Sequence, residues 1–149
     1  MTGLIDLYVY SLTEDEIKFL LFKRAKGKIY QSQWRMIGGK REANETYWQT
    51  ALREMREETG LTPEDFWTVP SLNHFYEHKT DQIHMIPAFA ARISADAHIL
   101  LNDEHSEYCW MHPEQAVQST NWPEQRRLMN LIEQIACREG ILPEWRIKF

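Results

Sequence analysis

Three carboxylates on one face of a single predicted helix are the feature that most constrains this chain. Within residues 38–61, GGKREANETYWQTALREMREETGL, the glutamates Glu54, Glu57 and Glu58 stand at positions i, i+3 and i+4. A helix repeats about every 3.6 residues, so these positions share one face, where like charges repel unless a cation neutralises them. Carboxylate oxygens suit Mg²⁺, with Mn²⁺ as a substitute. The segment therefore predicts a helix that carries a divalent-metal site.

The rest of the same segment indicates how the helix is anchored and where it ends. Its opposite face carries apolar side chains that could lie on a sheet, namely Tyr47, Trp48, Ala51, Leu52 and Met55. Arg53 stands one turn before Glu57, where it can pair with a carboxylate. Gly60 occupies the place where a helix ends with a positive φ, and Gly38 and Gly39 indicate a close approach of the backbone to another group.

From Gly39 to Leu61 the spacing G-x5-E-x7-R-E-U-x-E-E-x-G-U, with U a bulky aliphatic residue, resembles the Nudix box at every specified position. The resemblance implies an α/β protein with the Nudix fold, an α/β/α sandwich with a mixed central β-sheet. It also implies metal-dependent hydrolysis of a phosphoanhydride. Ile37 stands where many members have proline, and Asn44 replaces a frequent glycine, although asparagine tolerates the left-handed conformation.

The resemblance also implies a role for the charged residues at the specified positions of the box. Glu54 and Glu58 are expected to bind the metal directly, and Glu57 either directly or through a water molecule. Arg53 is expected to orient these carboxylates, and Glu45 to support the loop before the helix.

A second motif, E-H-x-x-Y-x-W at residues 104–110, is similar to a form found after the box in this family. On that similarity Glu104 is expected to be a further metal ligand or the general base, with Glu107 as the alternative. A solvated loop position for both glutamates is the competing interpretation. The general base is limited to Glu57 or Glu104, because family members differ in which carboxylate accepts the proton.

A run of basic residues, KRAKGK at residues 23–28, leads toward the box. Such runs usually form a solvated face, but with a phosphate ester as substrate these side chains could meet phosphate oxygens. Tyr30 or Trp34 could stack on a ring, with core packing as the alternative for Trp34. The residues expected to bind substrate are Arg24, Trp34, Arg35, Gly38, Gly39 and Lys40.

Composition narrows the class of protein. The 149 residues, 43% of them hydrophobic, predict one domain over residues 1–149. A net charge of −5 argues against a nucleic acid polymer or an anionic membrane as partner. Cys109 and Cys137 form no metal or disulfide pattern, which indicates a reducing compartment. With no apolar run long enough to span a bilayer and no signal-peptide pattern, the expected location is the cytoplasm.

The order of apolar patterns agrees with the implied sandwich. Residues 4–12 and 17–22 predict a hairpin, and residues 66–69, 72–78 and 83–93 predict further strands, with a break at Pro70 and an edge or bulge at Pro87. Asn121 is expected to cap a last helix that opens with Pro123. Its core face is Leu128, Leu131, Ile132 and Ile135. The tail, residues 141–149, either covers a sheet edge or meets a second copy in a homodimer.

Substrate choice rests on the downstream resemblance alone. Residues 104–110 together with NWPEQRRLMNLIEQ at 121–134 look like the dihydroneopterin triphosphate pyrophosphohydrolases. That similarity favours pterin or purine nucleoside triphosphates, cleaved to monophosphate and pyrophosphate. Nucleotide sugars, dinucleoside polyphosphates and oxidised nucleotides stay open. A non-catalytic module that binds a nucleotide is the alternative from another class.

Overall fold

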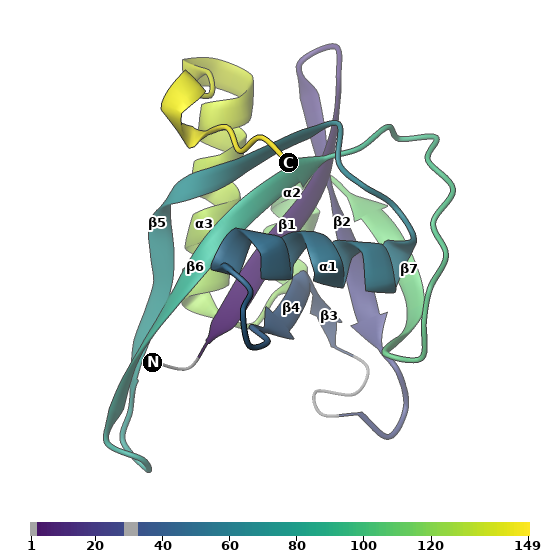
Figure 1. Ribbon diagram of the computed structural model, residues 1–149. Helices are drawn as coiled ribbons and strands as arrows, with labels where there is room; N and C mark the ends of the chain where they lie inside the picture. Colours follow the sequence, from purple (N-terminus) through teal and green to yellow (C-terminus); the bar gives the residue numbers. More distant parts are fainter. Residues whose placement is uncertain (1–2, 29–32) are drawn as a thin grey trace.

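The computed structural model describes residues 3–28 and 33–149 (Figure 1). The strands are β1 (Leu4–Thr13), β2 (Glu16–Arg24), β3 (Trp34–Arg35), β4 (Ile37–Lys40), β5 (Asp65–Glu77), β6 (Gln82–Arg92) and β7 (His105–Met111). The helices are α1 (Tyr47–Thr59), α2 (Pro113–Ser119) and α3 (Pro123–Gln134), followed by a π-helical turn (Ile135–Glu139) and a 3-10 turn (Pro143–Trp145). The predicted hairpin, β1 and β2, and the predicted box helix, α1, are confirmed.

In the described part of the chain, no helix is both long enough and apolar enough to cross a membrane.

The strands form one mixed sheet, in the order β3-β2-β1-β6-β5, with β4 also beside β1 and β7 beside β2. Strands β1 and β6 run parallel, whereas the other pairs are antiparallel. Helix α1 lies across one face of the sheet, and α2 and α3 lie on the other (Figure 1). This arrangement is the α/β/α sandwich that the box implied.

A fork between β1 and β2 places the glycine pair inside the sheet. The two strands pair only near their turn, from Val9 opposite Leu20 to Thr13 opposite Glu16. Beyond this point β4 pairs with the start of β1, and β3 pairs with the end of β2 (Figure 1). Helix α1 packs on β4, so the backbone at the fork lies directly under the box helix.

Alternation along β1 divides the core between the two faces of the sheet. On the α1 side the core includes Ile5, Leu7, Val9, Ala51 and Met55. On the α3 side the core includes Tyr8, Tyr10, Leu128, Ile132 and Ile135. These contacts confirm the predicted apolar faces of both helices. Asp6 shares its face of β1 with Tyr8 and therefore lies on the α3 side.

Proline placement in β5 and β6 follows from a shift in their pairing. The register between the strands changes between Thr68 and Leu72, across the predicted break at Pro70. Pro87 lies opposite Leu72, immediately before β6 begins to pair with β1. At this position β6 pairs with β5 alone and lies beside the register shift, so the edge and the bulge alternatives for Pro87 both agree with the structure.

The C-terminal tail covers the free edge of β5. The backbone N–H of Ile147 donates to the carbonyl oxygen of Phe66 at 2.9 Å, and Arg146 pairs with Asp65 at 3.1 Å. The ring of Phe149 also contacts that of Phe66. The edge-covering alternative is therefore confirmed, and the homodimer stays a prediction.

The start of α3 differs from the prediction by one residue. Trp122, not Asn121, is the N-cap residue, and it makes no side-chain capping hydrogen bond. The reason is Pro123, because a residue that precedes proline is forced out of the helical region. Trp122 accordingly has extended backbone angles, φ −83° and ψ 121°.

Candidate active site

Helix α1 is held at both ends by local contacts. At its start the side chain of Thr46 accepts a hydrogen bond from the backbone of Gln49, and the Gln49 side chain accepts one from the backbone of Thr46. At its end Gly60 has φ 76°, as predicted, and its N–H donates to the carbonyl oxygen of Arg56. Asn44, before the helix, also has a positive φ of 69°. These local contacts fix where α1, and with it the acidic face, begins and ends.

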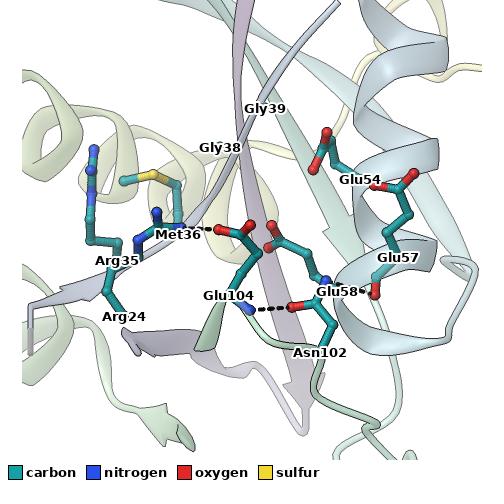
Figure 2. A pocket seen from close by; sticks show the side chains of 10 residues that line it. All are labelled: Arg24, Arg35, Met36, Gly38, Gly39, Glu54, Glu57, Glu58, Asn102 and Glu104. Carbon is teal, nitrogen blue, oxygen red and sulfur yellow. Dashed lines mark hydrogen bonds and ion pairs between the residues drawn. The ribbon is translucent and has the colours of Figure 1, made fainter. Parts of the chain in front are cut away.

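A cavity of about 410 Å³ lies beside this acidic face (Figure 2). Its lining comprises Arg24, Arg35, Met36, Gly38, Gly39, Glu54, Glu57, Glu58, Asn102 and Glu104. Figure 2 shows the carboxylates of Glu58 and Glu104 facing each other, one from α1 and one from the loop before β7. The cavity thus brings together the four glutamates predicted for the metal and base roles, together with Arg24, Arg35 and the glycine pair predicted to bind substrate.

Three of the candidate residues lie elsewhere. Trp34 packs against the core on the α3 side, in line with its core alternative. Lys40 contributes its carbonyl oxygen, which accepts a hydrogen bond from Arg53 Nη2 at 3.0 Å. Glu107 pairs with Lys23 at 3.5 Å, outside the cavity. Tyr30 lies outside the described residues.

Arg53 connects the box loop to the box helix. Its Nε and Nη2 donate to the two carboxylate oxygens of Glu45 at 2.7 and 3.1 Å. Its Nη1 donates to Glu54 at 2.9 Å and lies 3.4 Å from Glu57. The Arg53 side chain holds the pKa of Glu45 down at about 2, and the Glu45 hydrogen bonds raise the pKa of Arg53. The guanidinium group is therefore placed to fix the direction of several carboxylates at once.

Glu58 is the most deeply buried of the box carboxylates. The residue is 4% exposed, and its Oε2 has no hydrogen-bond partner among the described residues. Burial, together with the negative charges of Glu54 and Glu104, raises the pKa of Glu58 to about 8. Burial likewise raises the pKa of Glu54, against the opposing effect of Arg53. A buried carboxylate among like charges is a strong attractor for a cation.

His105 is a site residue that the sequence did not reveal as one. The residue is 5% exposed, its ring packs on that of Phe22, and its Nδ1 lies 3.6 Å from Oε2 of Glu58. Burial, together with the positive charge of Arg24, lowers the pKa of His105 to about 4. The imidazole is therefore neutral near pH 7 and gives Glu58 no positive charge.

Asn102 is a second residue that the sequence did not single out. Its Oδ1 accepts the backbone N–H of Glu104 at 2.9 Å, and its Nδ2 donates to the carbonyl oxygen of Glu57 at 3.1 Å. Arg24 Nη1 contacts the Glu104 carboxylate at 3.1 Å (Figure 2). Asn102 thereby ties the loop of Glu104 to helix α1. An asparagine two residues before Glu104 is typical of such a local turn, and this was the available clue.

The donor set fits a divalent cation, although the side chains are not arranged as a finished cage. Among residues 3–28 and 33–149, no three carboxylate, imidazole or thiol groups are placed as ready metal ligands. The physical reason is that Arg53 holds Glu54 and Glu57, while Arg24 holds Glu104. The buried, unpartnered Oε2 of Glu58 and the surrounding carboxylate oxygens are the chemistry that Mg²⁺ prefers.

Glu58 is expected to make the metal-free protein less stable as the pH rises. Its pKa is about 8 in the folded state and 4.5 as the ordinary value, so between these values the folded state keeps a proton that the unfolded state has lost. In denaturant titrations with a chelator, we expect the free energy of unfolding to fall by about 2 kcal/mol or more from about pH 5.5 to 8.5. Glu58→Gln should remove most of this slope; an equally steep slope in the variant would assign it to other groups.

Gly39 is required because the Glu54 side chain lies against it. A Cβ atom at position 39 would stand 2.3 Å from Cγ of Glu54, whereas one at Gly38 would meet nothing nearer than the Ile5 carbonyl oxygen at 3.8 Å. We expect Gly39→Ala to redirect Glu54, and thereby to weaken Mg²⁺ binding and reduce kcat/KM by about 10- to 100-fold, with little change in Tm. Gly38→Ala, the matched variant, should leave Mg²⁺ affinity unchanged. Equal losses of Mg²⁺ affinity in both variants would contradict this reason for Gly39.

A second cavity, of about 330 Å³, adjoins the first and shares Arg35, Gly38 and Gly39 with it. It lies on the α3 side of the sheet, and its lining comprises Leu4, Ile5, Asp6, Arg35, Gly38, Gly39, Asn73, Phe75, Glu77, His84, Ile86, Trp122 and Gln125. The rings of Phe75 and Trp122 lie 5.6 Å apart. The sequence predicted neither this cavity nor its polar residues.

A carboxylate-rich cavity beside an α/β/α sheet is typical of hydrolases that act on phosphorus-containing acid anhydrides, and this chain is one of them. A family model described as the NUDIX domain matches residues 6–132, so the chain belongs to the Nudix family. Nucleoside triphosphatase NudI of Salmonella arizonae is 30% identical over 115 residues, which are 72% of this chain and 82% of that protein.

Solved structures agree with the fold. An Ap4A hydrolase of C. elegans, solved as a binary complex, superposes with a TM-score of 0.72 at 20% identity, over 89% of this chain and 95% of that one. A Nudix hydrolase of Listeria monocytogenes gives a TM-score of 0.73 at 21% identity, over 90% and 93%. At this identity the likeness establishes the Nudix fold and not the substrate.

Proposed function

We propose that this chain is a Mg²⁺-dependent pyrophosphohydrolase that cleaves a nucleoside or pterin triphosphate into the monophosphate and pyrophosphate. The observation that carries the proposal is the pair of adjoining cavities, one lined by four carboxylates and two arginines and the other walled by aromatic rings. The first suits a cation and phosphates, and the second suits a flat ring. Mn²⁺ is expected to substitute for Mg²⁺.

The residues of the first cavity divide the work of hydrolysis. When bound, the divalent cation would supply charge neutralisation and a more acidic water. Glu54, Glu57 and Glu58 would hold it. Arg24 and Arg35 would meet the phosphate oxygens, because their guanidinium groups line the same cavity.

The chemical step needs one proton acceptor on the chain. A water oxygen bonds to the phosphorus of the monophosphate product while the anhydride P–O bond breaks and the electron pair leaves with pyrophosphate. The water proton passes to Glu57 or Glu104. Asn102 hydrogen-bonds to the backbone of both Glu57 and Glu104, so it would fix the distance between these two residues.

A panel with product identification tests the proposal. The purified protein is incubated with Mg²⁺ and, separately, with nucleoside triphosphates, dihydroneopterin triphosphate, a nucleotide sugar and a dinucleoside polyphosphate. We expect pyrophosphate and the monophosphate from triphosphates. Turnover of a sugar nucleotide or dinucleotide with no triphosphate cleaved would overturn the triphosphate assignment, and tight binding without turnover would favour the non-catalytic module.

A further inference from the structure

The second cavity has a polar floor built from three separate elements. Asp6 comes from β1, Asn73 from β5 and Gln125 from α3, and they are 6%, 5% and 3% exposed. Polar side chains at such depth are costly unless they are hydrogen-bonded. They line a space that shares Arg35, Gly38 and Gly39 with the lining of the carboxylate cavity. None of these three residues lines the carboxylate cavity, so they are not placed to contact the phosphates.

Hydrogen bonding on this floor leaves an excess of acceptors. Asn73 Nδ2 donates to Asp6 Oδ2 at 2.8 Å, and the Gln125 side chain also hydrogen-bonds to Asp6, so about two of the four acceptor positions of this carboxylate stay available. Gln125 Oε1, buried in the same floor, has no partner among the described residues. His84 Nε2 lies 3.0 Å from Glu77, so Nδ1, which has no partner among the described residues, is an acceptor in the tautomer that carries its proton on Nε2. A ligand that brings N–H donors would satisfy these atoms.

We propose that Asp6, Asn73 and Gln125 select a ring that presents adjacent N–H donors, the 2-amino-4-oxopyrimidine edge that guanine and pterins share. A carboxylate accepts two neighbouring N–H groups through paired hydrogen bonds, as it does from an arginine fork. Phe75 already stacks on His84 at 4.8 Å between ring centroids, so the stacking surface of this wall is the ring of Trp122, which is 37% exposed and packs against Phe75. A ring that lacks the amino group leaves a buried acceptor unpaired, and this rejects it more strongly than a change of shape would.

The geometry connects this selection to the reaction. A ring on the polar floor directs its phosphates past Gly38 and Gly39, which line both cavities and carry no side chain to block the path. Arg35 lines both cavities as well, so its charge acts on the Asp6 carboxylate and on the phosphate side of the site. The inference rests on the proposed function, because the ring must belong to a triphosphate.

The test compares substrates that differ only in the amino group. With Mg²⁺, we expect kcat/KM for GTP to exceed that for ITP by about 10- to 100-fold, and Asp6→Asn to reduce this ratio to about 3-fold or less. Gln125→Leu should reduce the ratio in the same direction and serves where Asp6→Asn fails to fold. Asp96→Asn, an exposed aspartate in a separate loop, is the matched control and should keep the wild-type ratio. Comparison of GTP with dihydroneopterin triphosphate distinguishes guanine from pterin as the source of the edge.

Two outcomes would overturn the inference: equal turnover of GTP and ITP by the wild type, or an unchanged ratio in both floor variants. A preference for a ring without adjacent N–H donors, such as uracil, would overturn the inference in the same way as equal turnover of GTP and ITP. Where no triphosphate is cleaved at all, the proposed function fails separately. Calorimetry with GMP and IMP in the absence of metal then tests the floor alone, with about 10-fold tighter binding of GMP as the supporting result.

Discussion

Replacing Glu58 with glutamine is expected to reduce Mg²⁺-dependent hydrolysis by about 10³-fold or more, the largest loss of any single change in this site. Glutamine keeps the size of the side chain but lacks the negative charge. In the wild type that charge is buried, and Oε2 of Glu58 has no hydrogen-bond partner among the described residues. Because the charge is unfavourable in the metal-free protein, Glu58→Gln should fold at least as stably as the wild type near pH 8. Initial rates across a Mg²⁺ titration, with unfolding curves on the same samples, measure both effects.

A comparison of Glu104→Gln with Glu107→Gln tests whether the rate of hydrolysis depends on the position of a carboxylate or only on the total charge. Glu104→Gln removes a carboxylate from the cavity and should reduce the rate by about 10²-fold, whereas Glu107→Gln removes one that pairs with Lys23 outside it and should stay within about 3-fold of wild type. A wild-type rate in Glu58→Gln at saturating Mg²⁺ would remove Glu58 from the mechanism. Equal losses in Glu104→Gln and Glu107→Gln would reject the placement of the second motif.

The acidic helix could be predicted because its signals are local. Spacing of 3.6 residues fixes which glutamates share a face, and Gly60 ends the helix through a backbone angle that its own lack of a side chain permits. Gly39 was expected to allow a close approach, but the approaching group, the Glu54 side chain, is visible only in the structure. Local patterns thus locate an element and its ends, whereas the partner across the fold needs coordinates.

The second cavity shows why the remaining features escaped prediction. In the sequence Asp6 is one polar residue in an apolar strand, and Asn73 lies 67 positions away. They meet because β1 and β5 both flank β6, an order that alternation of side chains cannot reveal. Gln125 reaches them from a helix whose expected feature was its apolar face. His105 likewise became a site residue only through burial against Phe22 and Glu58.

Arg53→Lys is expected to lower kcat by about 10²-fold while the Mg²⁺ concentration for half-maximal rate changes little. Lysine keeps the positive charge but cannot reproduce the fork that binds both oxygens of Glu45 at 2.7 and 3.1 Å together with the Lys40 carbonyl oxygen. The box loop and Glu54 then lose the side chain that binds both of them. The orientation of the Glu54 carboxylate therefore changes, whereas the net charge of the site does not. Since Arg53 is partly exposed, we expect a modest loss of about 1 to 2 kcal/mol in the free energy of unfolding.

Arg56→Lys is the matched control, because Arg56 stands on the same helix with an exposed side chain. It should change neither kcat nor stability beyond the roughly 0.5 kcal/mol typical of surface substitutions. A fall in Mg²⁺ affinity with unchanged kcat in Arg53→Lys would show that the hydrogen-bond geometry of Arg53 shapes the metal site and not the catalytic step. Equal behaviour of the two variants would show that the hydrogen bonds of Arg53 to Glu45 and Glu54 do not position the catalytic carboxylates. The expected separation of kcat from Mg²⁺ affinity follows directly from the bidentate geometry.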